Sequence, residues 1–310
     1  MQAIDQTAPV RVRVPAKVNL ALCVGDLDQD GYHPLGTVFH ALGIYDEVVA
    51  SPAPDGHTSL TISGEGADEL PTDERNLAWR AARLLAGRHG DPAMGVALHL
   101  KKQIPVAGGM AGGSADAAGA LLACSVLWDL DTTPDDLHSL AAELGSDVPF
   151  GLLGGTAIGR GRGDQLVPMI TRGTYHWVLA MAHEGLGTPG VFRRFDELQA
   201  RPGARPSSTD IPSGVTAALA CGDVRALGAA LCNDLQEAAL DLRPELRETL
   251  QAGLDAGALG ALVSGSGPTC AFLAANEAAA MDLRAALGQA PTVRATRRTT
   301  GPVPGASLIG

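Results

Sequence analysis

A glycine-rich segment, residues 105–118, contains the residues whose types and spacing most clearly indicate chemistry. Four of its residues are glycines within a span of six: Gly108, Gly109, Gly112 and Gly113. A helical pattern follows directly, with Ser114 as its predicted N-cap and Asp116 in its first turn. Glycines let the backbone approach a ligand closely, and the free N–H groups at a helix N-terminus attract an anion. We therefore predict that this loop binds phosphate groups.

One alternative is a flexible glycine turn between a strand and a core helix, which has a similar pattern. The loop is not a Walker P-loop, because no Gly-Lys-Ser or Gly-Lys-Thr triplet occurs in the chain. The Gly-x-Gly-x-x-Gly spacing of dinucleotide-binding folds occurs only at residues 185–190, where it contains a proline. Lys101 and Lys102, at the end of the preceding predicted strand, favour the phosphate-binding hypothesis.

Three further groups of side chains are candidates for contact with a ligand. Lys17 and Asn19 lie two residues apart on a predicted strand and so point to the same side, into a cleft or into solvent. Asp147 follows the end of a predicted helix and is the N-cap of a short helix, a carboxylate available as a base, or both. Tyr32 and His33 end a polar turn, and their side chains either pack against the domain or contact a ligand.

Composition limits the classes of function. At 310 residues the chain is long enough for two domains, and its 45% hydrophobic and 18% charged residues are typical of a globular protein. The net charge of −11 argues against binding of nucleic acid or of an anionic membrane, since both require a basic surface. An anionic small-molecule substrate therefore requires cations placed locally. The chain has only three lysines: Lys17, Lys101 and Lys102. Because arginine is the usual basic residue in this chain, these positions indicate a need for the compact ammonium group of lysine.

Cysteines and histidines give no indication of a metal site. The cysteines are scattered and include no Cys-x-x-Cys, so buried free thiols are expected rather than disulfides or zinc ligands: Cys23, Cys124, Cys221, Cys232 and Cys270. No two histidines have the i, i+4 spacing of a helical metal-ligand pair. Since neither a signal peptide nor an apolar run of 18 residues is present, we expect a soluble cytoplasmic protein.

The predicted elements mix strands and helices without a βαβ repeat. Strands are expected at 10–14 (an exposed sheet edge), 16–24, 36–50, 95–104, 175–182 and 293–296, and hairpins near 58–62 and 261–274. Helices are expected at 77–86, 114–130, 133–144 and 276–287, from residue 191, and over 215–255 with breaks near Gly222 and Pro244. Residues 151–163 are predicted to form turns and a strand, and a domain boundary is predicted near 160–170. Residues 201–214 are predicted to form a loop, and the last residues a tail.

Five motifs, taken in order, resemble those of the GHMP kinases. They are Pro-Ala-Lys-Val-Asn-Leu around Lys17, Asp-Gly-Tyr-His ending at His33, the glycine loop, Asp-Val-Pro at Asp147, and Ser-Gly-Ser-Gly-Pro from Ser264. The resemblance covers nearly the whole chain, about residues 14–304. It implies an α+β fold of two domains with a cleft between them. Residues 1–165 would form an ATP-binding domain resembling ribosomal protein S5, and residues 166–310 a ferredoxin-like α/β sandwich on the substrate side.

The resemblance also implies roles for the candidate residues. Lys17 and Asp147 are expected to be catalytic, with the aspartate accepting the proton of a substrate hydroxyl and the lysine offsetting charge on the transferred phosphoryl group. The ATP phosphates are expected to contact Pro105, Val106, Ala107, Gly108, Gly109, Met110, Ala111, Gly112, Gly113 and Ser114. The substrate is expected to contact Asn19, Tyr32, His33, Phe192 and Gly267. Among these, Tyr32 and Phe192 would stack on a cytosine that His33 hydrogen-bonds.

The activity so implied is ATP-dependent phosphorylation of a hydroxyl group on a cytidine-diphosphate conjugate of a sugar alcohol, in the non-mevalonate isoprenoid pathway. ATP and Mg²⁺ are the expected cofactors, the metal ligands are not identified, and the protein is expected to be a monomer or a homodimer. Two alternatives are a GHMP kinase acting on mevalonate, phosphomevalonate or homoserine, and a catalytically silent nucleotide-binding module.

The chain departs from the commoner family form in two places. Met110, Ala111 and Ala115 stand where leucine, glycine and serine are common, which removes one flexible position and one hydroxyl. The residues before Asp30 and Gly31 lack the usual arginine, so one phosphate contact is expected from elsewhere in the chain.

Overall fold

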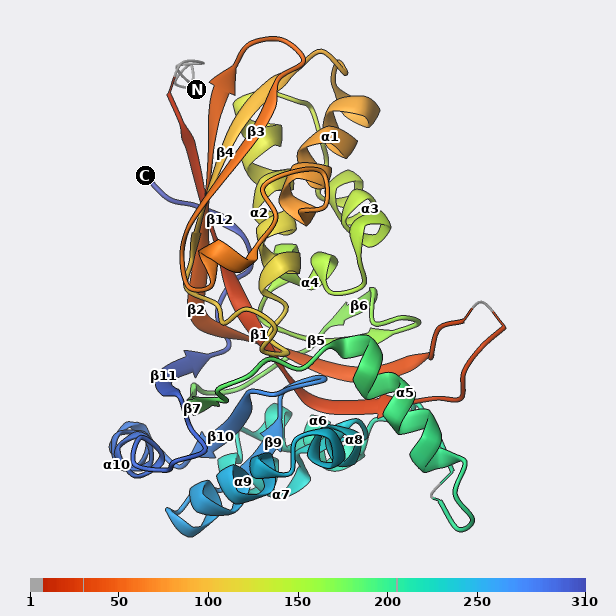
Figure 1. Cartoon of the computed structure of the whole chain (residues 1–310), viewed down its shortest axis with the longest axis vertical. Helices are drawn as coiled ribbons and strands as arrows, with labels where there is room; N and C mark the ends of the chain where they lie inside the picture. Colours follow the sequence, from red (N-terminus) through yellow and green to blue (C-terminus); the bar gives the residue numbers. More distant parts are fainter. Residues whose placement is uncertain (1–7, 30, 205) are drawn as a thin grey trace.

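The computed structural model describes residues 8–29, 31–204 and 206–310, and these residues form two β-sheets with helices packed against them (Figure 1). The strands of the first sheet are β1 (Val10–Val24), β2 (Leu35–Ala53), β3 (Thr58–Gly64), β4 (Gly95–Lys102), β5 (Thr156–Arg160), β6 (Gln165–Pro168), β8 (Cys232–Asn233) and β12 (Ser307–Leu308). Their order is β12-β1-β2-β4-β3, with β5 paired to β2, β6 to β5 and β8 to β1. Mixed α+β structure is as predicted.

The long strands β1 and β2 form the centre of the first sheet and carry the first candidate site residues. Proline 15 does not divide β1, because the pairing with β2 continues beyond it after a register shift between Pro15 and Ala16. The prediction of an exposed edge strand at 10–14 is wrong, since β12 pairs with Val12 and Arg13 on the side away from β2. The predicted hairpin near 58–62 is also wrong, because β3 runs parallel to β4.

Four helices cover one face of the first sheet (Figure 1): α1 (Leu77–His89), α2 (Gly112–Leu127), α3 (Pro134–Leu144) and α4 (Val148–Leu153). A short 3-10 turn, η1 (Ala67–Glu69), precedes them. Helix α2 is the central one and packs closely on β1 and β2. A Cβ atom at Gly119 would lie 2.6 Å from Val48 Cγ2 and 2.8 Å from Val14 Cγ2, so the close contact between helix and sheet requires glycine there.

Two of the four helices test the predicted end signals. Helix α3 begins with a capping box in which Thr133 accepts from the Asp136 backbone and Asp136 accepts from the Thr133 backbone, which confirms the predicted start. Helix α1 continues past Gly87, the predicted stop, and ends at Gly90. A single glycine costs a helix only about 1 kcal/mol relative to alanine, so packing against the sheet carries the helix through it.

The second sheet is antiparallel, with the order β11-β7-β10-β9. Its strands are β7 (Tyr175–Met181), β9 (Gly260–Val263), β10 (Cys270–Ala274) and β11 (Ala295–Gly301). The helices of this half are α5 (Thr188–Gln199), α6 (Ser213–Cys221), α7 (Val224–Ala230), α8 (Gln236–Leu242), α9 (Glu245–Asp255) and α10 (Glu277–Leu287). The predicted breaks at Gly222 and Pro244 are confirmed, and α5 begins three residues before the predicted start at 191.

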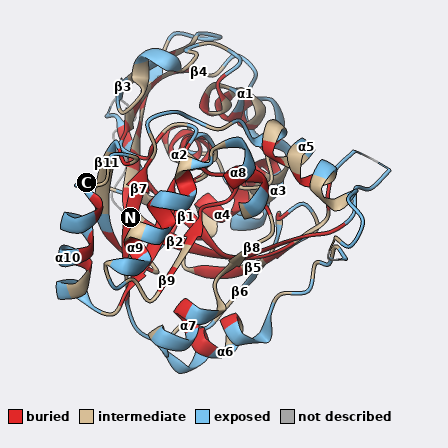
Figure 2. Cartoon of the chain, turned by 60° about the horizontal axis from the view of Figure 1, so that its bottom comes forward, coloured by how far each residue is buried: buried red, intermediate tan, exposed pale blue. Residues whose placement is uncertain are grey.

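The two faces of the second sheet pack in different directions. Trp177 and Leu179 belong to the hydrophobic core shared with the first sheet, whereas Val178 and Ala180 pack with α5, α8, α9 and α10. Buried residues accordingly run along the strands, while the outer sides of α7 and α10 are exposed (Figure 2). His40 of β2 lies in the contact between the sheets, and burial lowers its pKa to about 3, so it is neutral there.

The C-terminal residues are not the predicted tail. Val303 accepts a hydrogen bond from Gly155 at 2.8 Å, and Ala306 donates one to Gly151 at 2.8 Å, so the end of the chain runs beside the end of α4. A bridge between Gly154 and Pro304 and the strand β12 extend this contact. Among the described helices, none is long and apolar enough to cross a membrane. Three of the five cysteines, Cys23, Cys124 and Cys270, are buried, as predicted for most of them, whereas Cys221 is exposed.

Candidate active site

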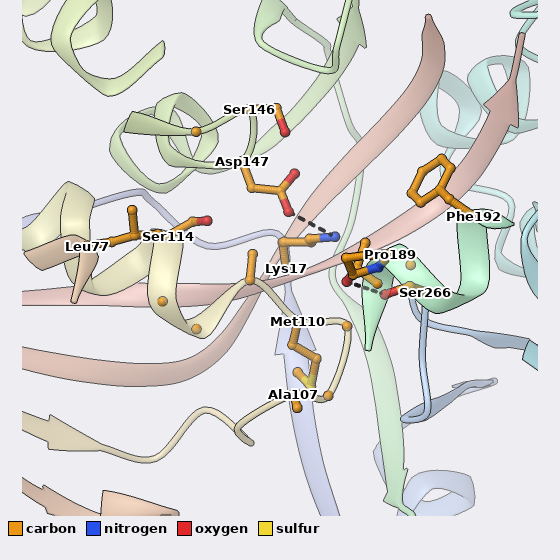
Figure 3. A pocket seen from close by; sticks show the side chains of 18 of the residues that line it. Lys17, Leu77, Ala107, Met110, Ser114, Ser146, Asp147, Pro189, Phe192 and Ser266 are labelled. Atoms are coloured by element: carbon orange, nitrogen blue, oxygen red, sulfur yellow. Dashed lines mark hydrogen bonds and ion pairs between the residues drawn. The ribbon is translucent and has the colours of Figure 1, made fainter. Parts of the chain in front are cut away.

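A cleft of about 1130 Å³ brings most of the predicted site residues together. It lies where β1, the glycine loop, the start of α2, the residues before α4, and α5 approach one another. In Figure 3 the side chains of Lys17 and Asp147 point toward each other across the cleft, with Ser114 on one side and Phe192 on the other. All ten predicted phosphate-binding residues, 105–114, line this cleft.

The glycine loop enters α2 through left-handed backbone conformations, which are unfavourable for residues other than glycine. Ala107 and Ala111 have φ angles of 51° and 58°, in the left-handed region, and Gly109 has 71°. Ala111 is the N-cap of α2 and makes no side-chain capping bond. The prediction of Ser114 as N-cap is therefore wrong, because the helix starts two residues earlier, at Gly112. The N–H groups of the first turn remain available to an anion, and the Ser114 hydroxyl lines the cleft instead of capping the helix.

The glycine loop packs tightly against the turn between β9 and β10. A Cβ atom at Gly109 would lie 2.0 Å from the backbone oxygen of Ser264, so no side chain fits at this position. Ser264 Oγ donates to the carbonyl oxygen of Gly109 at 3.1 Å. Gly265 and Ser266 of this turn line the cleft, and Ser266 contacts Thr188 of α5 through their hydroxyl groups at 2.9 Å. Gly267, a predicted substrate residue, lies behind them against Val263.

A buried group of three ionisable side chains holds both ends of the glycine loop. Lys102 Nζ donates to Asp46, to Asp116 at 2.5 Å and to the carbonyl oxygen of Gly112 at 3.3 Å. The other oxygen of Asp46 accepts from the backbone N–H groups of residues 103–104 at 2.6 and 2.8 Å. Asp46 thus holds the loop where it leaves β4, and Lys102 holds it where it enters α2.

These contacts correct two predictions. Asp116 is not a first-turn residue complementing the helix dipole; it is buried and paired with Lys102. Lys102 lines the cleft but its ammonium is neutralised by carboxylates, and Lys101 pairs with Glu47 at 3.1 Å outside the cleft. Burial, together with the nearby Asp46 charge, outweighs Lys102 and raises the pKa of Asp116 to about 8. The two carboxylates hold the pKa of Lys102 above its usual value despite burial, which alone would lower it.

Lys17, Asn19 and Asp147 form a connected polar group at the centre of the cleft. Lys17 Nζ donates to Asn19 Oδ1 at 2.7 Å and lies 3.6 Å from Asp147 Oδ2. Asn19 Nδ2 donates to Thr37 Oγ1 at 2.8 Å, and Thr37 in turn donates to the carbonyl of Ala21, so the orientation of the amide is set from behind. The Lys17 side chain is 8% exposed and that of Asp147 33%, so the sheet holds the lysine while the carboxylate faces the cleft.

The interpretation of Asp147 as the N-cap of a short helix is confirmed for its position, but not for its side chain. Asp147 occupies the N-cap position of α4, but its side chain accepts no hydrogen bond from the helix. Pro149, in the first turn of α4, has no N–H to be capped. The carboxylate is consequently directed at Lys17.

The aromatic residues lie at the end of the cleft near α5. His33 stacks on Phe192 with ring centroids 5.4 Å apart, and its ring nitrogens contact Gly25 O at 2.8 Å and Asp196 Oδ1 at 3.2 Å. Tyr32 is 54% exposed, and the guanidinium carbon of Arg162 lies 4.5 Å from its ring centroid. Tyr32, His33 and Phe192 all line the cleft, so the structure brings together the residues predicted to hold a base.

Sequence reasoning missed several residues of this site. Asp46 shares its side of the predicted strand with the apolar residues Val48 and Ala50, which is the one sign that its carboxylate is buried. Asn233 Nδ2 donates to the carbonyls of Val263 and Gly265, both at 2.7 Å, and so supports the turn beneath the glycine loop. Arg162 and Arg193 line the cleft from a turn and a helix whose position no local pattern predicts. Among the described residues, no group of three metal-ligating side chains occurs.

Comparison with known proteins identifies the class of this cleft. The model of the GHMP kinases N terminal domain matches residues 76–155, and that of the GHMP kinases C terminal matches residues 215–292. The chain belongs to the GHMP kinases, a family of ATP-dependent kinases of small molecules.

Within the family, the chain is 55% identical to the 4-diphosphocytidyl-2-C-methyl-D-erythritol kinase of Cutibacterium acnes over 304 residues, which cover 97% of each chain. It is 56% identical to the kinase of the same name from Mycolicibacterium smegmatis, covering 98% of this chain and 93% of the relative.

Solved structures agree on the fold. A crystal structure of 4-(cytidine 5'-diphospho)-2C-methyl-D-erythritol kinase superimposes with a TM-score of 0.76 at 33% identity, covering 97% of this chain and 99% of the other. Homoserine kinase from Cytophaga hutchinsonii gives a TM-score of 0.78 at 21% identity, covering 100% and 99%, which shows the fold alone.

Proposed function

We propose that this protein transfers the γ-phosphoryl group of ATP to the 2-hydroxyl of 4-diphosphocytidyl-2-C-methyl-D-erythritol, a step of the non-mevalonate isoprenoid pathway. The observation that carries the proposal is the arrangement of one cleft, which has a helix N-terminus and glycine loop on one side, Lys17 and Asp147 at the centre and an aromatic pocket at the end. Relatives more than 50% identical over nearly the whole chain carry the name of this kinase. We propose that it acts in the cytoplasm as a monomer or homodimer.

In this proposal the phosphates of ATP bind to residues 105–114. The N–H groups at the start of α2 and the hydroxyl of Ser114 contact them. Mg²⁺ would accompany the nucleotide and neutralise charge on its β- and γ-phosphates. The Ser114 hydroxyl is an oxygen ligand of the kind that this ion prefers, and it would hold the ion together with the phosphate oxygens of the nucleotide.

Asp147 and Lys17 carry the chemical step. The substrate hydroxyl oxygen attacks the γ-phosphorus, the bond from the γ-phosphorus to the bridging oxygen breaks, and ADP leaves with the electron pair. Asp147 orients the hydroxyl and accepts its proton, while Lys17 offsets the negative charge of the transferred group. Because phosphoryl transfer depends mainly on positioning and electrostatics, the support of Lys17 by Asn19 is part of the catalytic geometry.

The cytosine is proposed to bind between Tyr32 and Phe192. Both ring nitrogens of His33 already contact acceptors of the chain, so we assign its hydrogen bond with the base to its backbone groups. Asn19 lines the substrate side next to Lys17, and Gly267 shapes the turn behind Gly265 and Ser266. We retain the division into residues 1–165 on the ATP side and 166–310 on the substrate side as a proposal.

One experiment separates this function from its alternatives. ADP release is measured with wild type and Asp147→Asn over four acceptors: the cytidine conjugate, mevalonate, phosphomevalonate and homoserine. We expect turnover of the cytidine conjugate alone, and a fall in kcat of about 10²–10⁴-fold in the variant, the usual contribution of a general base. Absence of turnover on the cytidine conjugate would reject the substrate, and an unchanged kcat in the variant would reject the assigned base.

A further inference from the structure

The cations of the cleft differ in whether the chain already neutralises them. Among the described residues, five lysine and arginine side chains line the cleft: Lys17, Arg75, Lys102, Arg162 and Arg193. Three of them have acidic partners. Lys102 is paired with Asp46 and Asp116, Lys17 faces Asp147, and Arg75 forms hydrogen bonds with Asp73 at 2.7 to 3.1 Å.

Arg162 and Arg193 are the other two. Within the described parts of the chain, neither forms an ion pair, and both are exposed. They come from separate elements, Arg162 from the turn between β5 and β6 and Arg193 from α5. Both are placed beside the aromatic pocket, since Arg162 stacks on Tyr32 and Arg193 follows Phe192 in the chain.

The segment next to Tyr32 cannot supply these positive charges itself. Its residues before Asp30 include Asp26 and Asp28 and no basic side chain. With a net charge of −11 for the whole chain, a ligand carrying a diphosphate must find its cations in the cleft. An arginine is suited to this task, because its planar fork of N–H donors matches the oxygens of a phosphate.

We infer that Arg162 and Arg193 bind the diphosphate of a nucleoside diphosphate group whose base occupies the pocket of Tyr32 and Phe192. The inference rests on the proposed function and names two residues that recognise its substrate. The guanidinium of Arg162 lies over the ring of Tyr32, which is the residue proposed to stack on the base. Arg162 thereby links recognition of the base to recognition of the phosphates.

The test is equilibrium binding of cytidine, CMP and CDP by calorimetry, without ATP, to the wild type and to the variants Arg162→Gln, Arg193→Gln and Arg162→Lys. Arg75→Gln is the matched control, because Arg75 lines the same cleft but is already paired with Asp73. We expect each glutamine variant to weaken CDP binding by about 10- to 100-fold, the range for charge-assisted hydrogen bonds, and to change cytidine binding by less than about threefold. Arg162→Lys is expected to lie between, since it keeps the charge and loses the stacked fork.

Kinetics supply a second readout. In Arg162→Gln and Arg193→Gln, KM for the cytidine conjugate should rise while KM for ATP and kcat stay close to wild type. Thermal unfolding should match wild type, because both side chains are exposed.

The outcomes distinguish this inference from the proposed function. If the wild type binds CDP more tightly than cytidine and the glutamine variants do the same, the cytidine site stands and the assignment of the two arginines is overturned. If Arg162→Gln binds CDP or cytidine more tightly than wild type, Arg162 occupies the place of the base and the assignment is overturned as well. If the wild type binds none of the three ligands, the proposed function fails and this inference fails with it.

Discussion

Tyr32 lies on a turn and is 54% exposed, and the guanidinium of Arg162 lies over its ring. Replacing it with alanine should raise KM for the cytidine conjugate by about 10- to 100-fold, since stacking of an aromatic side chain on a base contributes about 1–3 kcal/mol. KM for ATP should change less than about twofold, because Ser114, at the start of α2, lies on the opposite side of the cleft from Phe192 of the aromatic pocket (Figure 3). Steady-state kinetics with each substrate varied separately measure the two values. Tyr32→Phe is the control that keeps the ring, and equal rises in both KM values would contradict the stacking role.

Asp116 predicts a specific pH dependence of stability. Its pKa is about 8 in the folded protein because of burial, against an ordinary value of 3.8. Between these pH values the folded state holds a proton that the unfolded state has released, so this group lowers the free energy of unfolding as the pH rises from about 4 to 8. Asp116→Asn removes the titration. The stability of wild type relative to Asp116→Asn should therefore decrease between pH 5 and pH 8, by up to about 1 kcal/mol per pH unit.

Denaturant unfolding at several pH values measures this difference. Asp282→Asn, at an exposed position of α10, is the control and should show the pH dependence of wild type. If the difference between wild type and Asp116→Asn is constant from pH 5 to pH 8, Asp116 does not hold the proton.

At the scale of elements, the loop into α2 contains two alanines in left-handed conformations. A non-glycine residue in this conformation costs about 1–2 kcal/mol, so Ala111→Gly should raise the free energy of unfolding by about 1 kcal/mol. Ala115→Gly, four residues later within α2, should lower it by about 1 kcal/mol or more, because glycine is unfavourable inside a helix. Urea denaturation of both variants provides the comparison. The changes in the free energy of unfolding should have opposite signs in the two variants. A loss of stability in both would refute the strained conformation of Ala111.

Local patterns predicted the elements whose signals lie within a few residues. The capping box of α3, the glycine loop and the helix that follows it needed no information from the rest of the chain. Ser114 was misplaced as N-cap because Ala111 takes up a left-handed conformation that alanine alone does not indicate. The parallel partner of β3, the burial of Asp46 and the place of Arg162 all depend on contacts between residues distant in sequence. Lys17 and Asp147 were singled out through motif resemblance, whereas the geometry of the pair required the fold.

At the scale of the whole molecule, the last residues of the chain support the helix that carries Asp147. Truncation after Gly301 removes the hydrogen bonds of Val303 and Ala306 with the end of α4, and that of Ile309 with β1. Three such bonds at about 1 kcal/mol each predict a loss of about 3 kcal/mol in the free energy of unfolding. Activity should fall as well, because α4 loses its backing. Thermal unfolding and ADP release measure both effects.

A shorter truncation controls for the loss of chain ends in general. Removal of residues 309–310 alone leaves the contacts of Val303 and Ala306 in place and should cost about 1 kcal/mol at most. Full activity and stability after truncation at Gly301 would show that α4 does not depend on the C-terminal segment.

The position of this segment also sets an order of events during biosynthesis. Most of the first sheet and the helices α1 to α4 are encoded in the first half of the chain and leave the ribosome first. The residues that complete the support of α4 follow the last strand of the second sheet and are synthesised after that sheet. The helix that carries Asp147 therefore acquires its full set of hydrogen bonds only after the second sheet has been synthesised, so an emerging chain that ends before residue 303 holds an incompletely supported cleft.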